Sequence, residues 1–419
     1  MKVQRCKGSR DLSPDDMTRF RLIEGTFRDC CLKGGYEEVR TPTLECLHLF
    51  TSTGTLTPGM LGKVYSFLDW DGWSGERVVL RPDGTIPVAR LYIDSMEERE
   101  LAKLFYVANV FIFEPTGKKT REGWQCGAEL IGAGSPLADV ELIMLALTVL
   151  KRLKIGDIEL RLSHAGVIRA LLAKLGLSPG EQARVFDRIL DGDVEALAGL
   201  EPGRAELREA LSLWLDLEGK SSGYLKNLKT LFPSNLPELE VALDDFINIV
   251  DLLEALGCNY QIDIASGRGF EYYTGVIFQL FIGEEKIGGG GRYDALIPLM
   301  GGRDTPASGI ALYLDRLMDL VTPEALAEPP APRILIRAEA EAMKQGFIIA
   351  SCLRDGGYVA ELYLGGQEQA NSRWTLEVRS KAPIFILNDE INHTRCEAQT
   401  ADEVLTLLGE EGADKGSPT

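Results

Sequence analysis

Two glycine-rich stretches that lie close together in the chain most constrain how it can fold. The first is Ala265-Ser-Gly-Arg-Gly-Phe-Glu-Tyr-Tyr-Thr-Gly-Val-Ile-Phe-Gln-Leu-Phe281, and the second is Gly288-Gly-Gly-Gly-Arg-Tyr-Asp294. Glycine permits tight turns and lets a ligand approach the backbone, and the apolar run 276–281 is typical of a buried strand. Either stretch alone is compatible with ordinary turns and core tyrosines. Together they predict a hairpin whose polar side chains face one cavity.

Length and composition indicate a globular protein of several domains. At about 100–200 residues per domain, a chain of 419 residues should form two or three domains. Hydrophobic residues make up 45% and charged residues 26% of the chain, as in globular proteins. Charges interrupt every long apolar stretch, and we recognise no signal peptide. We therefore expect a cytoplasmic protein that does not contact a membrane.

Cysteine and histidine usage gives no support to a metal site. The eight cysteines form no Cys-x-x-Cys pair, and the three histidines, at positions 48, 164 and 393, are far apart in sequence. Neither a zinc site nor a disulfide framework is indicated by such spacing. We expect no metal and no cofactor.

The charge balance argues against a nucleic-acid partner. The chain carries a net charge of −18, and residues 333–419 contain nine lysines and arginines against fourteen acidic residues. Proteins that hold nucleic acid usually present a basic face that neutralises phosphates. We therefore do not expect this C-terminal part to bind nucleic acid.

The hydrophobic pattern divides the chain into segments. Apolar residues at helical spacing predict a helix from Phe20 to Cys30, and 36–45 is predicted as a strand with a proline near its end. Residues 333–387 alternate as βαβαβ, which favours a small parallel or mixed sheet. The predicted domains are 1–164 (first part of a core), 165–257 (helical insertion), 258–321 (second part of the core), 322–332 (linker), 333–410 (small α/β domain) and 411–419 (disordered tail).

Beyond these patterns, specific motifs resemble a known family. Arg268-Gly-Phe-Glu-Tyr-Tyr-Thr-Gly275 and Gly289-Gly-Gly-Arg-Tyr-Asp294 look like the two histidine-specific signatures of histidyl-tRNA synthetases and their paralogues. Pro306–Leu317 resembles the third class II synthetase motif. The resemblance covers nearly the whole chain and implies an α+β fold. That fold is a class II aminoacyl-tRNA synthetase-like core, with an antiparallel sheet and flanking helices, a helical insertion and an anticodon-binding-like C-terminal domain.

Two departures from the synthetase pattern bear on activity. Asp83 stands where the synthetases have glutamate, and the form Leu80-Arg-Pro-Asp83 followed by 85–90 resembles the regulatory subunits of ATP phosphoribosyltransferase. In the second class II motif, Ile112 occupies the position of the arginine that grips the adenylate. Loss of that cation should cost several kcal/mol of transition-state stabilisation, so no catalytic residue is expected.

The resemblance also implies a set of binding residues. A family-type histidine pocket would use the ammonium-binding, carboxylate-binding and imidazole-binding positions Asp83, Thr85, Gln125, Glu129, Arg268, Tyr272 and Tyr273. Arg121 in the basic loop of the second motif and Arg316 in the third motif are candidates for phosphate or nucleotide binding. Alternatively, Arg121 lies at a solvated hairpin tip and Arg316 lies on a solvated helix face, and neither binds a ligand.

Three functions remain open at this stage. The leading hypothesis is a regulatory subunit that activates a separate, short ATP phosphoribosyltransferase catalytic subunit and mediates histidine feedback in the first step of histidine biosynthesis. The resemblance further implies a homodimer, formed through 36–45, within a hetero-oligomer. The main alternative is a histidyl-tRNA synthetase that activates histidine with ATP and charges tRNA. A third is a paralogue with an unrelated role.

Overall fold

The computed structural model describes residues 4–53, 61–70, 75–113, 120–174, 177–190, 218–219, 221–231, 237–263, 272–321, 331–365 and 372–413. The chain separates into two compact units, Met1–Ala325 and Leu326–Thr419, which are described separately. None of the helices in these ranges combines the length and apolar character needed to cross a lipid bilayer.

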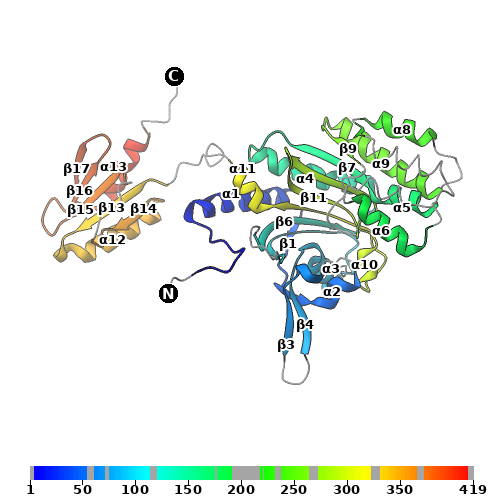
Figure 1. The fold of residues 1–419 in the computed structure, drawn as a ribbon. Helices are drawn as coiled ribbons and strands as arrows, with labels where there is room; N and C mark the ends of the chain where they lie inside the picture. The colour runs from blue at the N-terminus through cyan, green and yellow to red at the C-terminus, as the bar shows by residue number, and fades with distance from the viewer. Residues whose placement is uncertain are drawn as a thin grey trace. The chain divides into compact units, whose positions relative to one another are not determined.

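A nine-stranded sheet organises the first unit (Figure 1). All neighbouring strands are antiparallel except the pairs β1–β5 and β7–β9, which are parallel. The fold is therefore α+β with a mainly antiparallel sheet, as predicted. In spatial order the strands are β1 (Glu37–Glu38), β5 (Ala102–Phe111), β6 (Glu122–Ile131), β12 (Ala307–Tyr313), β11 (Glu285–Arg292), β10 (Val276–Ile282), β7 (Glu159–His164), β9 (Gln261–Asp263) and β8 (Glu218–Gly219).

The hairpin predicted from the two glycine-rich stretches is present. Strands β10 and β11 pair antiparallel, with Ile277 opposite Gly291. Hydrogen bonds also join the chain before β10 to the end of β11: the Thr274 N–H donates to the Arg292 carbonyl at 2.8 Å, and the Asp294 N–H donates to Thr274 Oγ1 at 3.0 Å. Residues 272–294 thus form one continuous wall at the centre of the sheet.

The predicted N-terminal helix is confirmed as α1 (Pro14–Lys33). A reciprocal capping box between Ser13 and Asp16 begins it, and Phe20, Ile23, Phe27 and Cys30 form its buried face. This apolar stripe packs against helices α4 (Pro136–Arg152) and α11 (Leu314–Leu320). Proline occupies the first turn of α4, although the preceding Ser135 makes no side-chain cap hydrogen bond. Three shorter helical elements complete this part: α2 (Leu47–Ser52), η1 (Leu61–Lys63) and α3 (Thr85–Ser95).

The segment predicted as one strand over 36–45 is instead two strands in different sheets. β1 joins the large sheet, whereas β2 (Leu44–Cys46) pairs with β4 (Gly75–Leu80), which in turn pairs with β3 (Ser66–Trp70). The chain bends at Pro42, which cannot donate a ladder hydrogen bond. The buried Arg81 guanidinium donates to the carbonyls of Thr41 and Pro42 at 2.9 and 3.2 Å. Figure 1 shows β3 and β4 extending away from the large sheet.

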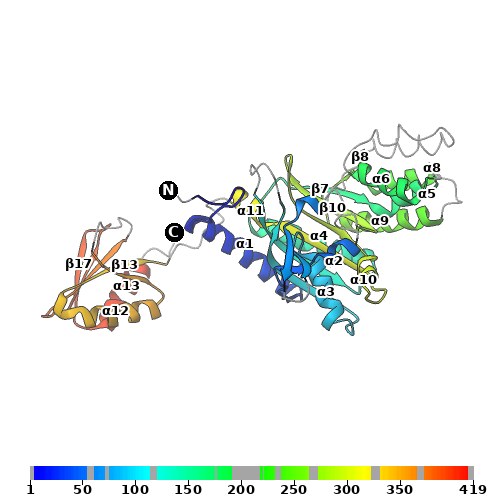
Figure 2. The same cartoon turned by 60° about the horizontal axis from the view of Figure 1, so that its bottom comes forward.

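The segment predicted as a helical insertion forms helices at one end of the first unit (Figure 2). Its residues 218–219 break the all-helical pattern, because they pair with β9 as the edge strand β8. Residues 191–217 of this segment lie outside the described residues. Its described residues form helices α5 (Ala165–Lys174), α6 (Pro179–Leu190), α8 (Ser222–Leu231) and α9 (Pro237–Ala255), and a short helix α10 (Leu296–Leu299) follows the second glycine stretch.

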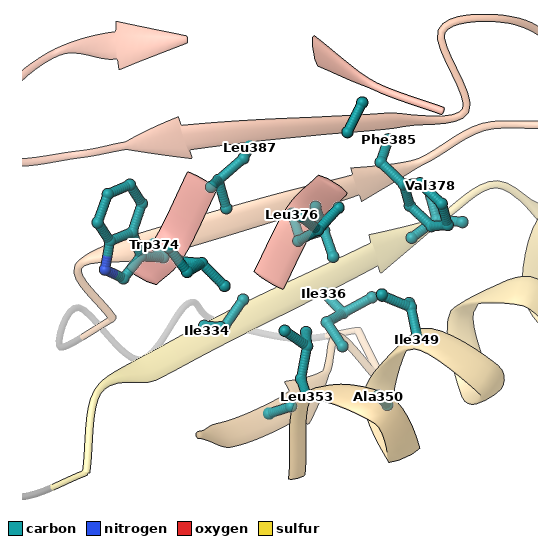
Figure 3. Close-up of a cluster of buried hydrophobic side chains, with 14 of the residues drawn as sticks. Ile334, Ile336, Ile349, Ala350, Leu353, Trp374, Leu376, Val378, Phe385 and Leu387 are labelled. Atoms are coloured by element: carbon teal, nitrogen blue, oxygen red, sulfur yellow. The ribbon is translucent and has the colours of Figure 1, made fainter. Parts of the chain in front are cut away.

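The C-terminal unit is a five-stranded mixed sheet with helices packed on it. Strand β13 is parallel to both β14 and β15, and the remaining pairs are antiparallel. Its core comes from alternate strand residues and from one face each of helices α12 and α13, and Figure 3 shows the strand residues with the α12 face. The elements are β13 (Arg333–Ala338), η5 (Ala340–Ala342), α12 (Met343–Asp355), β14 (Val359–Leu362), β15 (Trp374–Val378), β16 (Phe385–Asp389), β17 (Thr394–Ala398) and α13 (Ala401–Ala413).

Two predictions for this unit are wrong. We expected a helix between 366 and 382, but 374–378 forms strand β15, in which Trp374, Leu376 and Val378 alternate into the core. The predicted disordered tail begins too early, since helix α13 continues to Ala413. Residues 414–419, and most of the predicted linker 322–332, lie outside the described residues.

Candidate functional site

One face of the large sheet carries most of the predicted binding residues. On β6, Gln125, Gly127 and Glu129 share a side because alternate strand residues point the same way. Pairing places Tyr106 of β5 opposite Gly127 and Gly309 of β12 opposite Glu129. Continuing across the sheet, the same side presents several residues with no side chain or a methyl group: Gly127, Gly309, Ala311, Gly289 and Gly291.

The structure brings six of the seven predicted histidine-binding residues into a buried group on this face. Tyr272 lies 5.2 Å from Tyr273 and 5.7 Å from Tyr293 between ring centroids, and the Tyr293 hydroxyl donates to Glu129 Oε2. Arg268, the seventh residue, lies outside the described residues. We call the following buried residues the signature cluster: Asp83, Thr85, Tyr106, Gln125, Glu129, Tyr272, Tyr273 and Tyr293.

Glycine is required where the cluster side chains cross the sheet. A Cβ at Gly309 would overlap Glu129 Oε2, and one at Gly127 would overlap the Tyr106 ring. A Cβ at Gly291 would lie 2.9 Å from two Tyr273 ring carbons. Real Cβ contacts are longer, so these glycines allow side chains of neighbouring segments to lie flat on the strands.

Asp83 stands at the start of helix α3. Its Oδ1 accepts a hydrogen bond from the Ile86 N–H at 3.1 Å, which is the geometry of a capping carboxylate. Burial raises the pKa of Asp83 to about 6, against the opposing effect of the backbone N–H groups of Ile86, Thr85 and Gly84. A buried carboxylate with a raised pKa is suited to pairing with a cationic ligand group.

Glu129 is the most strongly perturbed acid of the cluster. Its side chain is fully buried, and burial raises the pKa of Glu129 to about 8, against the hydrogen bond from Tyr293. Within the part of the chain that the structure describes, Glu129 Oε1, Gln125 Oε1 and the Tyr106 hydroxyl are buried without a hydrogen-bond partner. Native proteins rarely leave buried polar atoms unsatisfied, so these three groups are available to a polar ligand.

Sequence reasoning missed two members of the cluster. Tyr293 lies within the second glycine stretch, and only the tertiary contact with Glu129 assigns it to the site. Tyr106 reads as part of an apolar strand, and its ring is confined between Gly84 and Gly127. The conspicuous Arg292, in contrast, faces the other side: it is buried and ion-paired with Asp139 at 2.8 Å.

The remaining predicted positions, Ile112, Arg121 and Arg316, lie outside the signature cluster. Ile112 follows Tyr106 at an even spacing along the strand direction, and its side chain is 50% exposed. The Arg121 guanidinium lies 4.7 Å from the centroid of the Phe113 ring. Arg316 is exposed and ion-paired with Glu285 at 2.6 Å. None of these three side chains is a member of the signature cluster.

Residues 8–317 match the histidyl-tRNA synthetase family. A structure of similar fold is that of an ATP phosphoribosyltransferase regulatory subunit/histidyl-tRNA synthetase from Bacillus halodurans, with a TM-score of 0.76 and 25% identity, covering 91% of this chain and 100% of that one. The structure of histidyl-tRNA synthetase from Nostoc, at 19% identity, has a TM-score of 0.75 and covers 98% and 100% of the two chains. The fold is thus that of the class II synthetases.

Among curated relatives, the regulatory subunit of ATP phosphoribosyltransferase from Dehalococcoides mccartyi is 53% identical over 412 residues, which cover 98% of this chain and all of the relative. Histidine–tRNA ligase from Archaeoglobus fulgidus is 34% identical and covers 94% of each chain. The chain therefore belongs to the histidyl-tRNA synthetase family and, within it, to the regulatory subunits of ATP phosphoribosyltransferase.

Proposed function

We propose that this protein binds a separate, short catalytic subunit of ATP phosphoribosyltransferase, activates it, and makes it sensitive to histidine. Its family membership supports the partnership. The observation that carries histidine sensing is the signature cluster, a buried set of polar groups with unsatisfied acceptors on a fold whose activating arginine is replaced by Ile112.

In the proposed pocket, each group supplies what histidine lacks. Asp83 and Thr85 contact the ammonium, and Arg268 contacts the carboxylate. Gln125 lies between the two ends of the ligand, and Glu129 contacts the imidazole. The neighbouring rings of Tyr272 and Tyr273 close the pocket, with Tyr273 beside the imidazole. Removal of Arg268 would leave a desolvated carboxylate, so Arg268→Ala should lose about 2–5 kcal/mol of histidine affinity by calorimetry.

Histidine would control the enzyme by binding two states of the complex with different affinity. A coupling of about 1–3 kcal/mol gives a roughly 5- to 150-fold effect, and it is reciprocal. The subunit should therefore bind histidine more tightly in the inhibited complex than alone. The test is to mix this chain with the catalytic subunit of the same organism and follow phosphoribosyl-ATP formation with and without histidine. Absence of both co-elution and any change in rate would contradict the proposal.

The alternative, histidyl-tRNA synthetase activity, makes a different prediction. With Ile112 at the arginine position, the purified chain should show no histidine-dependent exchange of pyrophosphate with ATP, because preorganised charge at the transferring phosphoryl group is lost. It should also bind tRNA weakly. Robust exchange would instead favour the synthetase.

We further propose a homodimer that uses the 36–45 region. Leu44 on β2 and Phe67 on β3 are each 45% exposed, and strand pairing places both on the same face of the three-stranded sheet. Exposed apolar patches of this kind mark interaction sites. Leu44→Glu combined with Phe67→Glu should shift the sedimentation coefficient to that of a monomer, while Leu364→Glu, in the C-terminal unit, should not.

A further inference from the structure

The helical insertion meets the first glycine-rich stretch at the short segment 273–275. Helix α5 begins directly after β7, and its first N–H, from Ala165, donates to the Gly275 carbonyl at 2.8 Å. A Cβ at Gly166 would lie 3.2 Å from the Thr274 carbonyl oxygen, so only glycine lets the first turn of α5 pack this closely. The insertion is therefore in direct contact with backbone that carries part of the signature cluster.

Arg169, on the next turn of α5, makes a further contact to this segment. Its guanidinium donates to the Tyr273 carbonyl at 3.4 Å. It also lies over the Phe186 ring of α6, 4.4 Å from the ring centroid. Phe186 is buried, whereas Arg169 is exposed. One surface side chain thus joins the backbone of a cluster residue to the packed face of a helix that has no residue in the cluster.

The Tyr273 ring is confined inside the signature cluster. It lies on Gly291, where a Cβ would be 2.9 Å from two of its carbons, and its centroid is 5.2 Å from that of the Tyr272 ring. Closely packed side chains transmit displacements to their neighbours. A ligand that shifts this ring should therefore also shift the carbonyl that Arg169 contacts.

His164 fixes the start of α5. Its Nδ1 accepts a hydrogen bond from the Val167 N–H at 3.3 Å, so the proton of a neutral imidazole is on Nε2. Nε2 lies 3.2 Å from Asp245 Oδ2 on α9. Because this pairing ties the first turn of α5 to α9, a displacement at Tyr273 should reach Arg169 rather than be absorbed by movement of the whole helix.

We propose that Arg169 is a positioning residue for the histidine pocket and that, through it, histidine binding orders helix α6. This inference rests on the proposed function and adds the region of the molecule that responds to the ligand. Occupation of the pocket holds Tyr273 in one position, which favours the Arg169 contact and with it the packing of Phe186. Coupling of this kind is reciprocal, so loss of the Arg169 contact must weaken histidine binding.

Hydrogen exchange of the full chain, followed by mass spectrometry with and without saturating histidine, tests this coupling. In the wild type, histidine should slow exchange in 179–190, because exchange there reports local opening of α6. Arg169→Gln should lose this difference and bind histidine roughly three- to tenfold more weakly, the scale of one exposed cation–aromatic contact and one long hydrogen bond. Arg169→Lys, which can still donate to the carbonyl, should retain part of both effects.

Two comparisons separate positioning from a purely structural role. Arg184→Gln removes an exposed arginine of α6 itself, and it should change neither the histidine affinity nor the exchange difference. If Arg169 only holds α6 on α5, Arg169→Gln will speed exchange in 179–190 equally with and without histidine and keep the affinity. That result overturns the inference and leaves the proposed function intact, whereas absence of histidine binding by the wild type overturns both. Arg169→Lys supplies the same readouts if Arg169→Gln fails to fold.

Discussion

Glu129 and Asp389 are both buried carboxylates, but their pKa values shift in opposite directions. Burial raises the pKa of Glu129 to about 8, and one of its oxygens has no hydrogen-bond partner among the described residues. In the C-terminal unit the pKa of Asp389 falls to about 2, because the Arg373 guanidinium and the N–H groups of Asn392 and Ile391 outweigh its burial. Burial alone therefore does not distinguish a carboxylate of a candidate binding site from one in a structural ion pair. The hydrogen-bond partners that each carboxylate has within the protein make this distinction.

The largest loss of stability should come from removing Asp389, the carboxylate that already has its hydrogen-bond partners. Asp389→Ala would strand the partly buried Arg373, which donates to Asp389 at 2.8 and 3.1 Å, and removing one partner of a buried ion pair typically costs about 3–5 kcal/mol. We expect the urea midpoint of the C-terminal unit to fall steeply, while histidine binding in the other unit persists. Glu377→Ala, which removes the partner of the more exposed Arg379, should change the midpoint little.

Acid titration tests the same link without mutation. The folded pKa of Asp389 lies below its ordinary value of 3.8, so its contribution to stability is complete above about pH 4 and is lost as the pH falls through about 2. Unfolding of the C-terminal unit, followed by tryptophan fluorescence, should show this loss. A stability that is flat between pH 4 and 2 would contradict the ion-pair account.

The next largest loss of stability should come from filling the space that the Glu129 carboxylate occupies. A Cβ at Gly309 overlaps Glu129 Oε2, so Gly309→Ala must displace the carboxylate. We expect a loss of about 1–3 kcal/mol in unfolding free energy, as for overpacked cores, together with loss of histidine binding. Gly283→Ala would add strain at a positive φ in the exposed hairpin turn, and it should leave histidine binding intact.

A milder change prevents Glu129 from ionising when a cationic ligand group binds, and keeps the shape of the side chain. Glu129→Gln can still accept the Tyr293 hydrogen bond, so folding should be retained, while histidine affinity should fall by about 1–3 kcal/mol, the scale of a hydrogen bond to a charged group. Calorimetry at pH 7 measures this. Unchanged affinity would remove Glu129 from the pocket.

The pH dependence of stability should reverse between the two carboxylates. Because the folded pKa of Glu129 is above its ordinary value, the folded state holds a proton that the unfolded state has lost. The contribution of Glu129 to the unfolding free energy therefore decreases as the pH rises from about 4.5 to about 8. Above about pH 8 this contribution is constant. In Glu129→Gln the part of this decrease that Glu129 causes should be absent, and equal slopes in both proteins would contradict the assignment.

The sequence alone predicted the central features of the first unit because they depend on local rules. Helix α1 follows from the spacing of Phe20, Ile23, Phe27 and Cys30, and the β10–β11 hairpin follows from an apolar run beside glycines. The prediction failed at Pro42 and in 374–378. There, the hydrogen bonds of Arg81 and the alternating core contacts of Trp374 and Leu376 decide the local structure, and both involve residues distant in sequence.

What the sequence determined by itself is the family and the set of residues proposed for the pocket, because the motifs 80–90, 268–275 and 289–294 are contiguous. The tertiary structure decided how those motifs interact. Only pairing of β6 with β12 places Glu129 over Gly309, and only the fold brings Tyr106 and Tyr293 to the same carboxylate. Register and packing between distant segments set these contacts, and no local pattern in the chain encodes them.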